Sequence, residues 1–356
     1  MLTEALTWGY RCNGVARTAP EVSNPAMRAL AAMVIAFTVN VYAQSAPPDA
    51  TPLDAVPAIL DLFKTYQVVG LGEGPHGNLE GAAFRLELIR DPLFPSVVND
   101  ILIEMGTARY QAVMDRYISG ETVPRQELRR AWEDTTNPGT NADKPIYQEF
   151  LAAVRGVNAT LPKEKRLRVL LGDPPIAWEF VRNRSDLRRW NMQRDAHAYA
   201  VLKRESLSKN RKALIIYGDG HFQGRGFPAL SLTRLIERDK VKIFTISTKY
   251  GNLIKLQPSV KSWKAPSFAR LRGTVLGKKF YAQYYPMPPA PGWNTVLMED
   301  QFDGVVYLGP NQPTMTLMPK SLCLDAAYMK MRIARLNAVA PGSVDDLKKL
   351  CAALTR

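Results

Sequence analysis

The sequence has few cysteines and few histidines, three of each among 356 residues. So few cysteines exclude a small domain held together by many disulfides, and no pair of them has the spacing of a structural zinc site. The chain has no Gly-x-Ser-x-Gly motif, which argues against an ordinary α/β-hydrolase with a serine nucleophile. Internal repeats and low-complexity tracts are also missing. Function therefore has to be sought in the positions of individual polar residues.

The overall composition is that of a folded, basic protein. Hydrophobic residues make up 46% of the chain and charged residues 22%, which excludes a disordered or collagen-like chain. The net charge is +14 and the pI is near 9.7, and such proteins are attracted to nucleic acid, anionic surfaces and acidic small molecules. Because the basic residues are dispersed among acidic ones and no nucleic-acid-binding motif is present, we do not expect a nucleic-acid partner.

Residues 1–43 have the character of a signal or leader segment. Met27 and Arg28 are followed by the apolar run 29–39 and a small-residue cleavage site at Ala43. The run is shorter than the roughly 20 residues that a membrane span needs. We predict an exported protein, periplasmic or secreted, that begins at Met27, is cleaved after Ala43 and has no transmembrane segment when mature. A long signal peptide or an anchored amino-terminal helix is the alternative.

Cleavage would leave most of the chain and most of its charge. The 43 residues removed carry a net charge of +1, so the mature chain keeps 313 residues and a net charge of +13. This length favours one elaborated domain. The charge predicts weak association with anionic envelope surfaces.

Export changes the interpretation of the cysteines, because removal of residues 1–43 leaves only Cys323 and Cys351. An even pair in an oxidising compartment predicts a disulfide. Both lie in segments with helical patterns, 322–336 and 343–354, so the bridge would join two helices as a hairpin. Two separate buried thiols are the alternative.

Strand-like and helix-like segments alternate along the chain, which predicts an α/β fold with a mainly parallel sheet covered by helices on both faces. We expect residues 44–53 to be a linker, 54–310 to form the α/β domain and 311–356 to form a carboxyl-terminal helical extension. Residues 255–301, rich in Pro, Gly, aromatic and basic residues, predict a loop-rich insertion or lid. The expected strands are 66–72, 97–105, 167–171, 213–217, 241–247 and 303–309, and the helices between them include 79–89, 108–119, 125–133, 146–158 and 191–207.

Polar residues follow four of the expected strands where each strand ends. In a parallel sheet with helical crossovers, ligands bind at the carboxyl ends of the strands. Two of the three histidines and four carboxylates therefore fall at one edge of the sheet. These residues are Glu73, His76, Glu104, Asp173, Asp219 and His221.

The first of these strand ends also matches a dinucleotide-binding pattern by spacing alone, Gly72-x-Gly74-x-x-Gly77. We do not favour a nucleotide, because a Glu and a His stand where the pyrophosphate needs room.

The segment Val68-Val69-Gly70-Leu71-Gly72-Glu73-Gly74-Pro75-His76-Gly77, followed by Glu80 and Arg85, resembles the first motif of the erythromycin esterase-like proteins. These belong with haem-uptake and Tiki-type proteins in one broad superfamily. The segments 101–104 and 215–221 match further motifs in the same order. The resemblance covers roughly residues 55–310 and implies a hydrolase-like or ligand-binding site. It places the reactive centre on Glu73, His76, Arg85, Glu104 and His221.

The same residues suggest acid–base chemistry. His76, oriented by Glu73 or Glu104, is a suitable base to activate water for attack on an ester carbonyl, and His221 and Arg85 are suited to polarise the carbonyl. This mechanism requires no cofactor. Glu73, His76, Glu104 and His221 also make a plausible shell for a divalent metal, and the histidines are possible haem ligands.

Several of these residues also have a structural interpretation. Glu104 is a possible buried ion-pair partner of Arg85, and Asp173, before two prolines, is more typical of a turn than of catalysis, which leaves Asp173 and Asp219 as substrate-contacting or supporting residues. His197, among charged neighbours, is expected on a solvated helix face. The aromatic and basic stretch 263–285 is either part of a substrate pocket or an ordinary packed loop.

These observations predict an exported esterase-like hydrolase that acts on a small molecule. The alternative is a haem- or metal-binding periplasmic protein of the same superfamily.

Overall fold

The computed structural model describes residues 46–223, 231–284 and 295–356. The predicted leader, with its cleavage site at Ala43, lies outside these residues. Within the described part of the chain, no helix is both long enough and apolar enough to cross a membrane.

The core of the fold is an eight-stranded sheet in the order β1-β7-β8-β6-β2-β5-β3-β4. All neighbours from β8 to β4 pair in parallel, whereas β7 pairs antiparallel with both β8 and β1 at one edge. The prediction of a mainly parallel α/β fold is confirmed. The strands are β1 (Leu53–Asp54), β2 (Val68–Gly72), β3 (Asp100–Thr107), β4 (Arg168–Asp173), β5 (Ala213–Tyr217), β6 (Ile243–Lys249), β7 (Ser267–Arg270) and β8 (Gly304–Tyr307).

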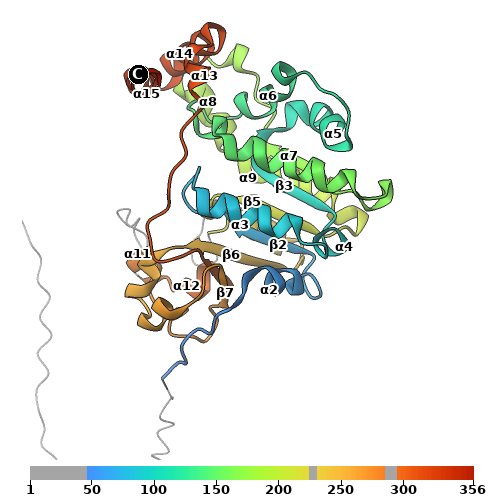
Figure 1. Cartoon of the computed structure of the whole chain (residues 1–356), viewed down its shortest axis with the longest axis vertical. Helices are drawn as coiled ribbons and strands as arrows, with labels where there is room; N and C mark the ends of the chain where they lie inside the picture. Colours follow the sequence, from blue (N-terminus) through green and yellow to red (C-terminus); the bar gives the residue numbers. More distant parts are fainter. Residues whose placement is uncertain (1–45, 224–230, 285–294) are drawn as a thin grey trace, which may run out of the picture. The chain divides into compact units, whose positions relative to one another are not determined.

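Helices cover both faces of the sheet because the apolar residues of its strands alternate between two cores (Figure 1). In β5, Leu214 and Ile216 pack on the face of α2, α3, α5 and α7, whereas Ala213 and Ile215 pack on the face of α9 and α10. The helices are α2 (Ala55–Leu62), α3 (Leu79–Arg90), α4 (Phe94–Val97), α5 (Gln111–Ser119), α6 (Arg125–Glu133), α7 (Pro145–Ala159), α8 (Arg184–Asn191), α9 (Arg194–Glu205), α10 (Leu232–Arg238), α11 (Tyr281–Tyr284), α12 (Met298–Gln301), α13 (Lys320–Leu324), α14 (Ala326–Val339) and α15 (Ser343–Thr355).

Two details differ from the sequence pattern. The segment 255–301, expected to be loops, contributes β7, a strand of four residues that is too short to give a clear alternation. The expected helix 191–207 begins only at Arg194, after α8 has ended at Asn191, so that Arg194 and Asp195 form the first turn of α9.

The carboxyl-terminal segment forms three helices rather than two. Asp325 ends the first helix and caps the second, since its side chain accepts a hydrogen bond from the backbone N–H of Tyr328 (3.0 Å). Cys323 in α13 and Cys351 in α15 form the predicted disulfide. The disulfide therefore links the first and last helices of the carboxyl-terminal extension.

Candidate functional site

The candidate site lies at the carboxyl ends of five neighbouring strands, β6, β2, β5, β3 and β4. The turn after β2 needs glycine at two places, because Gly74 and Gly77 have φ values of +68° and +90°. Asn78 is fully buried and fixes this turn. Its Nδ2 donates to the carbonyl oxygens of Glu73 (2.9 Å) and Pro75 (2.6 Å), and its Oδ1 caps α3 at Gly81 N–H.

His76 stands on this turn and is held by Glu73. His76 Nδ1 lies 2.7 Å from Glu73 Oε2, and the other oxygen of Glu73 lies 3.3 Å from the Arg85 guanidinium. Glu73 and Arg85 are buried, whereas 30% of the His76 side chain is exposed. The imidazole therefore presents Nε2 to the pocket, with a fixed carboxylate behind it.

Glu104 is the centre of the site. It is buried at the end of β3, where one oxygen accepts a hydrogen bond from Arg194 (2.5 Å) and the other from the backbone N–H of Gly218 (2.6 Å). His76 Nε2 lies 3.9 Å and His221 Nε2 lies 3.4 Å from the same Glu104 oxygen, Oε1. Both histidines thus face one carboxylate.

His221 is held in the same manner as His76, by a different acid. Its Nδ1 makes a short hydrogen bond with the carboxylate of Asp195, in the first turn of α9. The site therefore contains two carboxylate–histidine pairs, Glu73 with His76 and Asp195 with His221, both close to Glu104 Oε1.

Arg194 joins Glu104 to Asp173 at the end of β4. Its Nε donates to Asp173 Oδ1 (3.2 Å), and the same carboxylate accepts the backbone N–H and the hydroxyl of Thr136 (both 2.7 Å). Asp173 is buried and does not line the pocket, so it supports Arg194. Burial raises the pKa of Asp173 to about 6, despite the opposing charge of Arg194.

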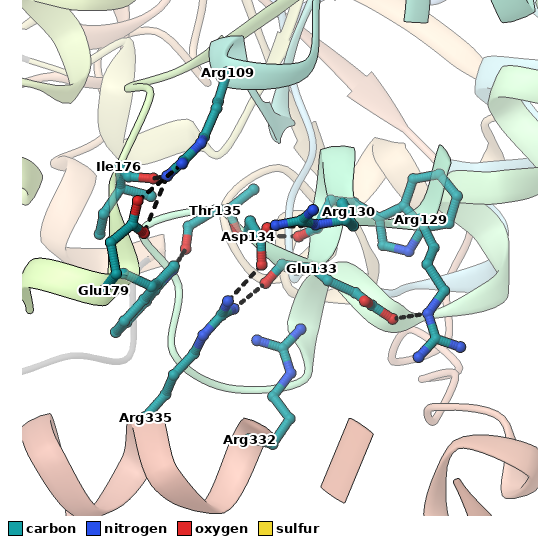
Figure 2. A network of polar contacts seen from close by, with 12 residues as sticks. Arg109, Arg129, Arg130, Glu133, Asp134, Thr135, Ile176, Glu179, Arg332 and Arg335 are labelled. Atoms are coloured by element: carbon teal, nitrogen blue, oxygen red, sulfur yellow. Dashed lines mark hydrogen bonds and ion pairs between the residues drawn. The ribbon is translucent and has the colours of Figure 1, made fainter. Parts of the chain in front are cut away.

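The segment that carries Thr136 is tied to the carboxyl-terminal helices. Figure 2 shows Arg335, from α14, reaching the Glu133 carbonyl oxygen (2.8 Å) and the Asp134 carboxylate. A continuous set of polar contacts therefore runs from α14 through this segment and Asp173 to Arg194.

The two histidines have raised pKa values. Burial alone would lower the pKa of His221, but the charge of Glu104 and the hydrogen bond to Asp195 outweigh it and raise the pKa to about 9. Burial also opposes protonation of His76, but Glu73 raises its pKa above the usual 6.5. The neighbouring cations hold the pKa of Glu104 well below its usual range, although its burial acts in the opposite direction. At neutral pH His221 is therefore an imidazolium and Glu104 a carboxylate.

A pocket of about 510 Å³ opens over these residues. His76, Glu104, Arg194 and His221 line one part of it. Glu73 and Arg85 instead line a separate small cavity of about 20 Å³ behind His76. The remaining lining residues are Gly74, Pro75, Gly218, Asp219, Gly220, Thr248, Lys249, Tyr250, Asn252, Tyr284, Gln312 and Pro313.

The predicted site residues thus take different positions around one centre. Glu73, His76, Glu104 and His221 come together, and Arg85 joins them through Glu73 rather than as the ion-pair partner of Glu104. Asp219 lines the pocket, where its carboxylate accepts hydrogen bonds from Ser247 and from the buried Lys249 (3.3 Å).

Sequence reasoning missed Arg194 and Asp195, which it placed with His197 on a solvated helix face. His197 itself is half-buried and lies outside the pocket lining. The two residues form the first turn of α9, the second α-helix after β4, and no local signal marks that start within the helix expected over 191–207. Of the stretch 263–285, Tyr284 lines the pocket, whereas Trp263 and Tyr281 pack in the core; Tyr285 lies outside the described residues.

Some residues of the site are suited to bind a metal ion, but the contacts of Glu104 oppose it. Glu73, His76 and Glu104 offer ligand atoms within 4.8 Å of one another, and a histidine whose Nδ1 is held by a carboxylate is typical of metal ligands. However, both Glu104 oxygens already accept hydrogen bonds, one of them from the cation of Arg194. A metal ion at this position would lie beside the positive charge of Arg194, which disfavours a second cation.

Comparison with known proteins supports the fold. No family model and no curated protein matches the chain. A Bacillus cereus protein of known structure matches with a TM-score of 0.51 at 14% identity, covering 76% of this chain and 97% of the other. The erythromycin esterase EreC matches with a TM-score of 0.47 at 12% identity (73% and 94% covered). The haem-binding protein ChaN of Campylobacter jejuni matches with a TM-score of 0.38 at 16% identity (56% and 87% covered).

The matches include both kinds of protein that the sequence resemblance named, an esterase and a haem-binding protein. At these identities the likeness is one of fold alone. The activity of this chain has to be argued from its own site.

Proposed function

We propose that the protein is an esterase-like hydrolase that activates water with His76. The observation that carries this proposal is the pair of carboxylate-oriented imidazoles that face Glu104 in one pocket. His76 is exposed enough to contact substrate and water. His221 has a pKa raised to about 9 and is therefore protonated at neutral pH. Two titratable groups with different environments are suited to the roles of base and acid.

In this mechanism neutral His76 takes a proton from water through Nε2, and the hydroxide adds to the ester carbonyl. Glu73 stabilises the imidazolium that forms, and Arg85 keeps Glu73 in place. The protonated His221 and Arg194 line the same pocket as His76, where they stabilise the negative oxygen of the tetrahedral intermediate. His221 then gives a proton to the leaving alcohol. Arg194 thus takes the role first considered for Arg85.

The proposal predicts a bell-shaped dependence of kcat/KM on pH for the esters and lactones in a substrate panel that the protein hydrolyses. The rate should rise as His76 loses its proton, above pH 6.5, and fall as His221 loses its proton near pH 9. His221→Gln should remove the alkaline fall and lower kcat about 10²-fold. His197→Gln is the matched control and should keep both limbs. No hydrolysis of any panel member, or an unchanged alkaline limb in His221→Gln, would contradict the proposal.

The alternative function is binding of a metal or haem by the same histidines. It is favoured by one observation, that both Nδ1 atoms are held by carboxylates while both Nε2 atoms face the pocket. A bound metal would act as a Lewis acid. Glu73, His76 and Glu104, whose ligand atoms lie within 4.8 Å of one another, would hold it.

Chelation separates the two functions. We expect dialysis against a chelator to leave hydrolysis unchanged, because Arg194 and Gly218 already satisfy Glu104. Metal content is measured by elemental analysis before and after dialysis. A stoichiometric metal that is lost together with activity, and lost from His76→Ala protein, would favour the alternative.

We also propose that the protein is exported, either to the periplasm or out of the cell. The Cys323–Cys351 disulfide supports an exported protein, because such bonds persist in oxidising environments.

A further inference from the structure

The segment between β4 and α9 carries the two most exposed large apolar side chains in the described part of the chain. Phe180 is 74% exposed and Met192 is 75% exposed. The segment follows Asp173 and ends just before Arg194. Both ends of the segment therefore lie at the edge of the sheet that holds the candidate site.

Between these two side chains the segment is strongly basic. Residues 180–192 contain four arginines and one acid, Asp186, a net charge of +3. In α8 the exposed residues recur at helical spacing, with Arg184 and Arg188 four residues apart, whereas Asp186 and Leu187 are buried. The exposed apolar side chains thus flank the exposed basic ones, with Phe180 before α8 and Met192 directly after it.

Two of the arginines have no partner of their own. Arg182 and Arg189 pair with Asp186. Among residues 46–223, 231–284 and 295–356, no ion pair or hydrogen bond engages the guanidinium of Arg184 or Arg188. Both guanidinium groups therefore have hydrogen-bond donors available for an anion.

A hollow of about 1080 Å³ lies beside this helix face, and both arginines line it. Its other wall runs from Asn337, near the end of α14, through the turn to Ser343, the first residue of α15. Among the residues that the structure describes, its other lining side chains are neutral and none is Asp or Glu. The hollow therefore suits a group that is negatively charged and partly apolar.

We propose that α8 and its flanking residues, Phe180 and Met192, form a docking surface for a membrane rich in anionic phospholipid. Arg184 and Arg188 bind lipid phosphates, because a guanidinium donates paired hydrogen bonds to phosphate oxygens. Phe180 and Met192 enter the interface between headgroups and acyl chains. A nucleic acid would bind the arginines but leave Phe180 and Met192 in water. A lipid surface binds the arginines through its phosphates and also buries the two apolar side chains. This surface is independent of the proposed hydrolytic function.

The test is co-sedimentation of the purified protein with vesicles. Vesicles of phosphatidylcholine with 30% phosphatidylglycerol should bind the protein, and vesicles of phosphatidylcholine alone should bind it weakly or not at all. Arg184→Gln/Arg188→Gln should weaken binding to anionic vesicles about 25-fold, since each basic residue near such a surface contributes a factor of about five. Phe180→Ser/Met192→Ser should weaken it at least about tenfold.

The matched control is Lys163→Gln/Lys165→Gln, which removes the same charge from an exposed turn just before β4, at the opposite end of that strand from residues 180–192. This variant should bind within about twofold of the unaltered protein. All variants change exposed side chains, and circular dichroism checks their fold. Absence of binding, equal binding to neutral vesicles, or equal losses in the control and the arginine variant would overturn the proposal.

Discussion

Replacing His76 by alanine is expected to lower kcat/KM for ester hydrolysis by about 10²- to 10⁴-fold, the usual contribution of a positioned general base. The loss should appear mainly in kcat, because water remains in the pocket but no longer has a neutral nitrogen to accept its proton. Steady-state kinetics on the best substrate of the panel measures the effect. Since part of the His76 side chain is exposed, the variant should fold normally.

His197→Gln is the control, because it changes a histidine that lies outside the pocket lining. It should retain activity within about threefold. Glu73→Gln should show an intermediate loss, since it keeps the size of the side chain but removes the charge that stabilises the imidazolium. Activity that His76→Ala leaves unchanged would remove the proposed base and the mechanism with it.

Replacing Asp143 by alanine is expected to lower the free energy of unfolding by about 3–5 kcal/mol, because it leaves a buried guanidinium without its counter-charge. Asp143 and Arg332 are both fully buried, and Arg332 Nη2 lies 2.9 Å and 2.8 Å from the two carboxylate oxygens. The Tyr328 hydroxyl donates to the same carboxylate (2.5 Å). Urea unfolding of the protein with its disulfide intact measures the change.

Two controls separate the buried pair from ordinary surface pairs. Arg116→Gln breaks exposed contacts with Glu121 and Glu127 and should cost less than about 1 kcal/mol. The double variant Asp143→Leu/Arg332→Met removes both charges and should recover much of the stability lost in Asp143→Ala. A loss below 1 kcal/mol in Asp143→Ala would show that water reaches the Arg332 guanidinium after the substitution.

Asp143 and Arg332 also explain why the carboxyl-terminal helices are not a detached extension. Arg332 belongs to α14 and Asp143 to the segment before α7, 189 residues away in the chain. Arg335, one helical turn later in α14, is bound to the segment that supports Asp173 (Figure 2). The sequence predicted helices here but gave no sign of these partners.

The sequence by itself determined the six parallel strands and the edge at which their carboxyl ends meet, but not β1 and β7, the two antiparallel strands. Apolar runs such as Ile101-Leu102-Ile103 are buried on both faces, and helical crossovers force such strands to be parallel, so their carboxyl ends meet at one edge. The glycines and the acidic and histidine residues that follow β2, β3 and β5 could therefore be assigned to one site. The Cys323–Cys351 disulfide was predicted from the two cysteines that the predicted cleavage would leave, with two separate thiols as the alternative.

Only the tertiary structure decided which residues touch within that site. Strand order is set by packing between segments far apart in the chain, and it places β5 between β2 and β3, so that His221 and His76 both face Glu104. Arg194 and Asp195 enter the site because α8 ends and α9 begins just before them, a break that no periodicity marked. The hydrophobic pattern of a segment predicts whether it is a helix or a strand and which of its residues are buried. The ion-pair partner of a charged side chain instead depends on which distant segments pack against it.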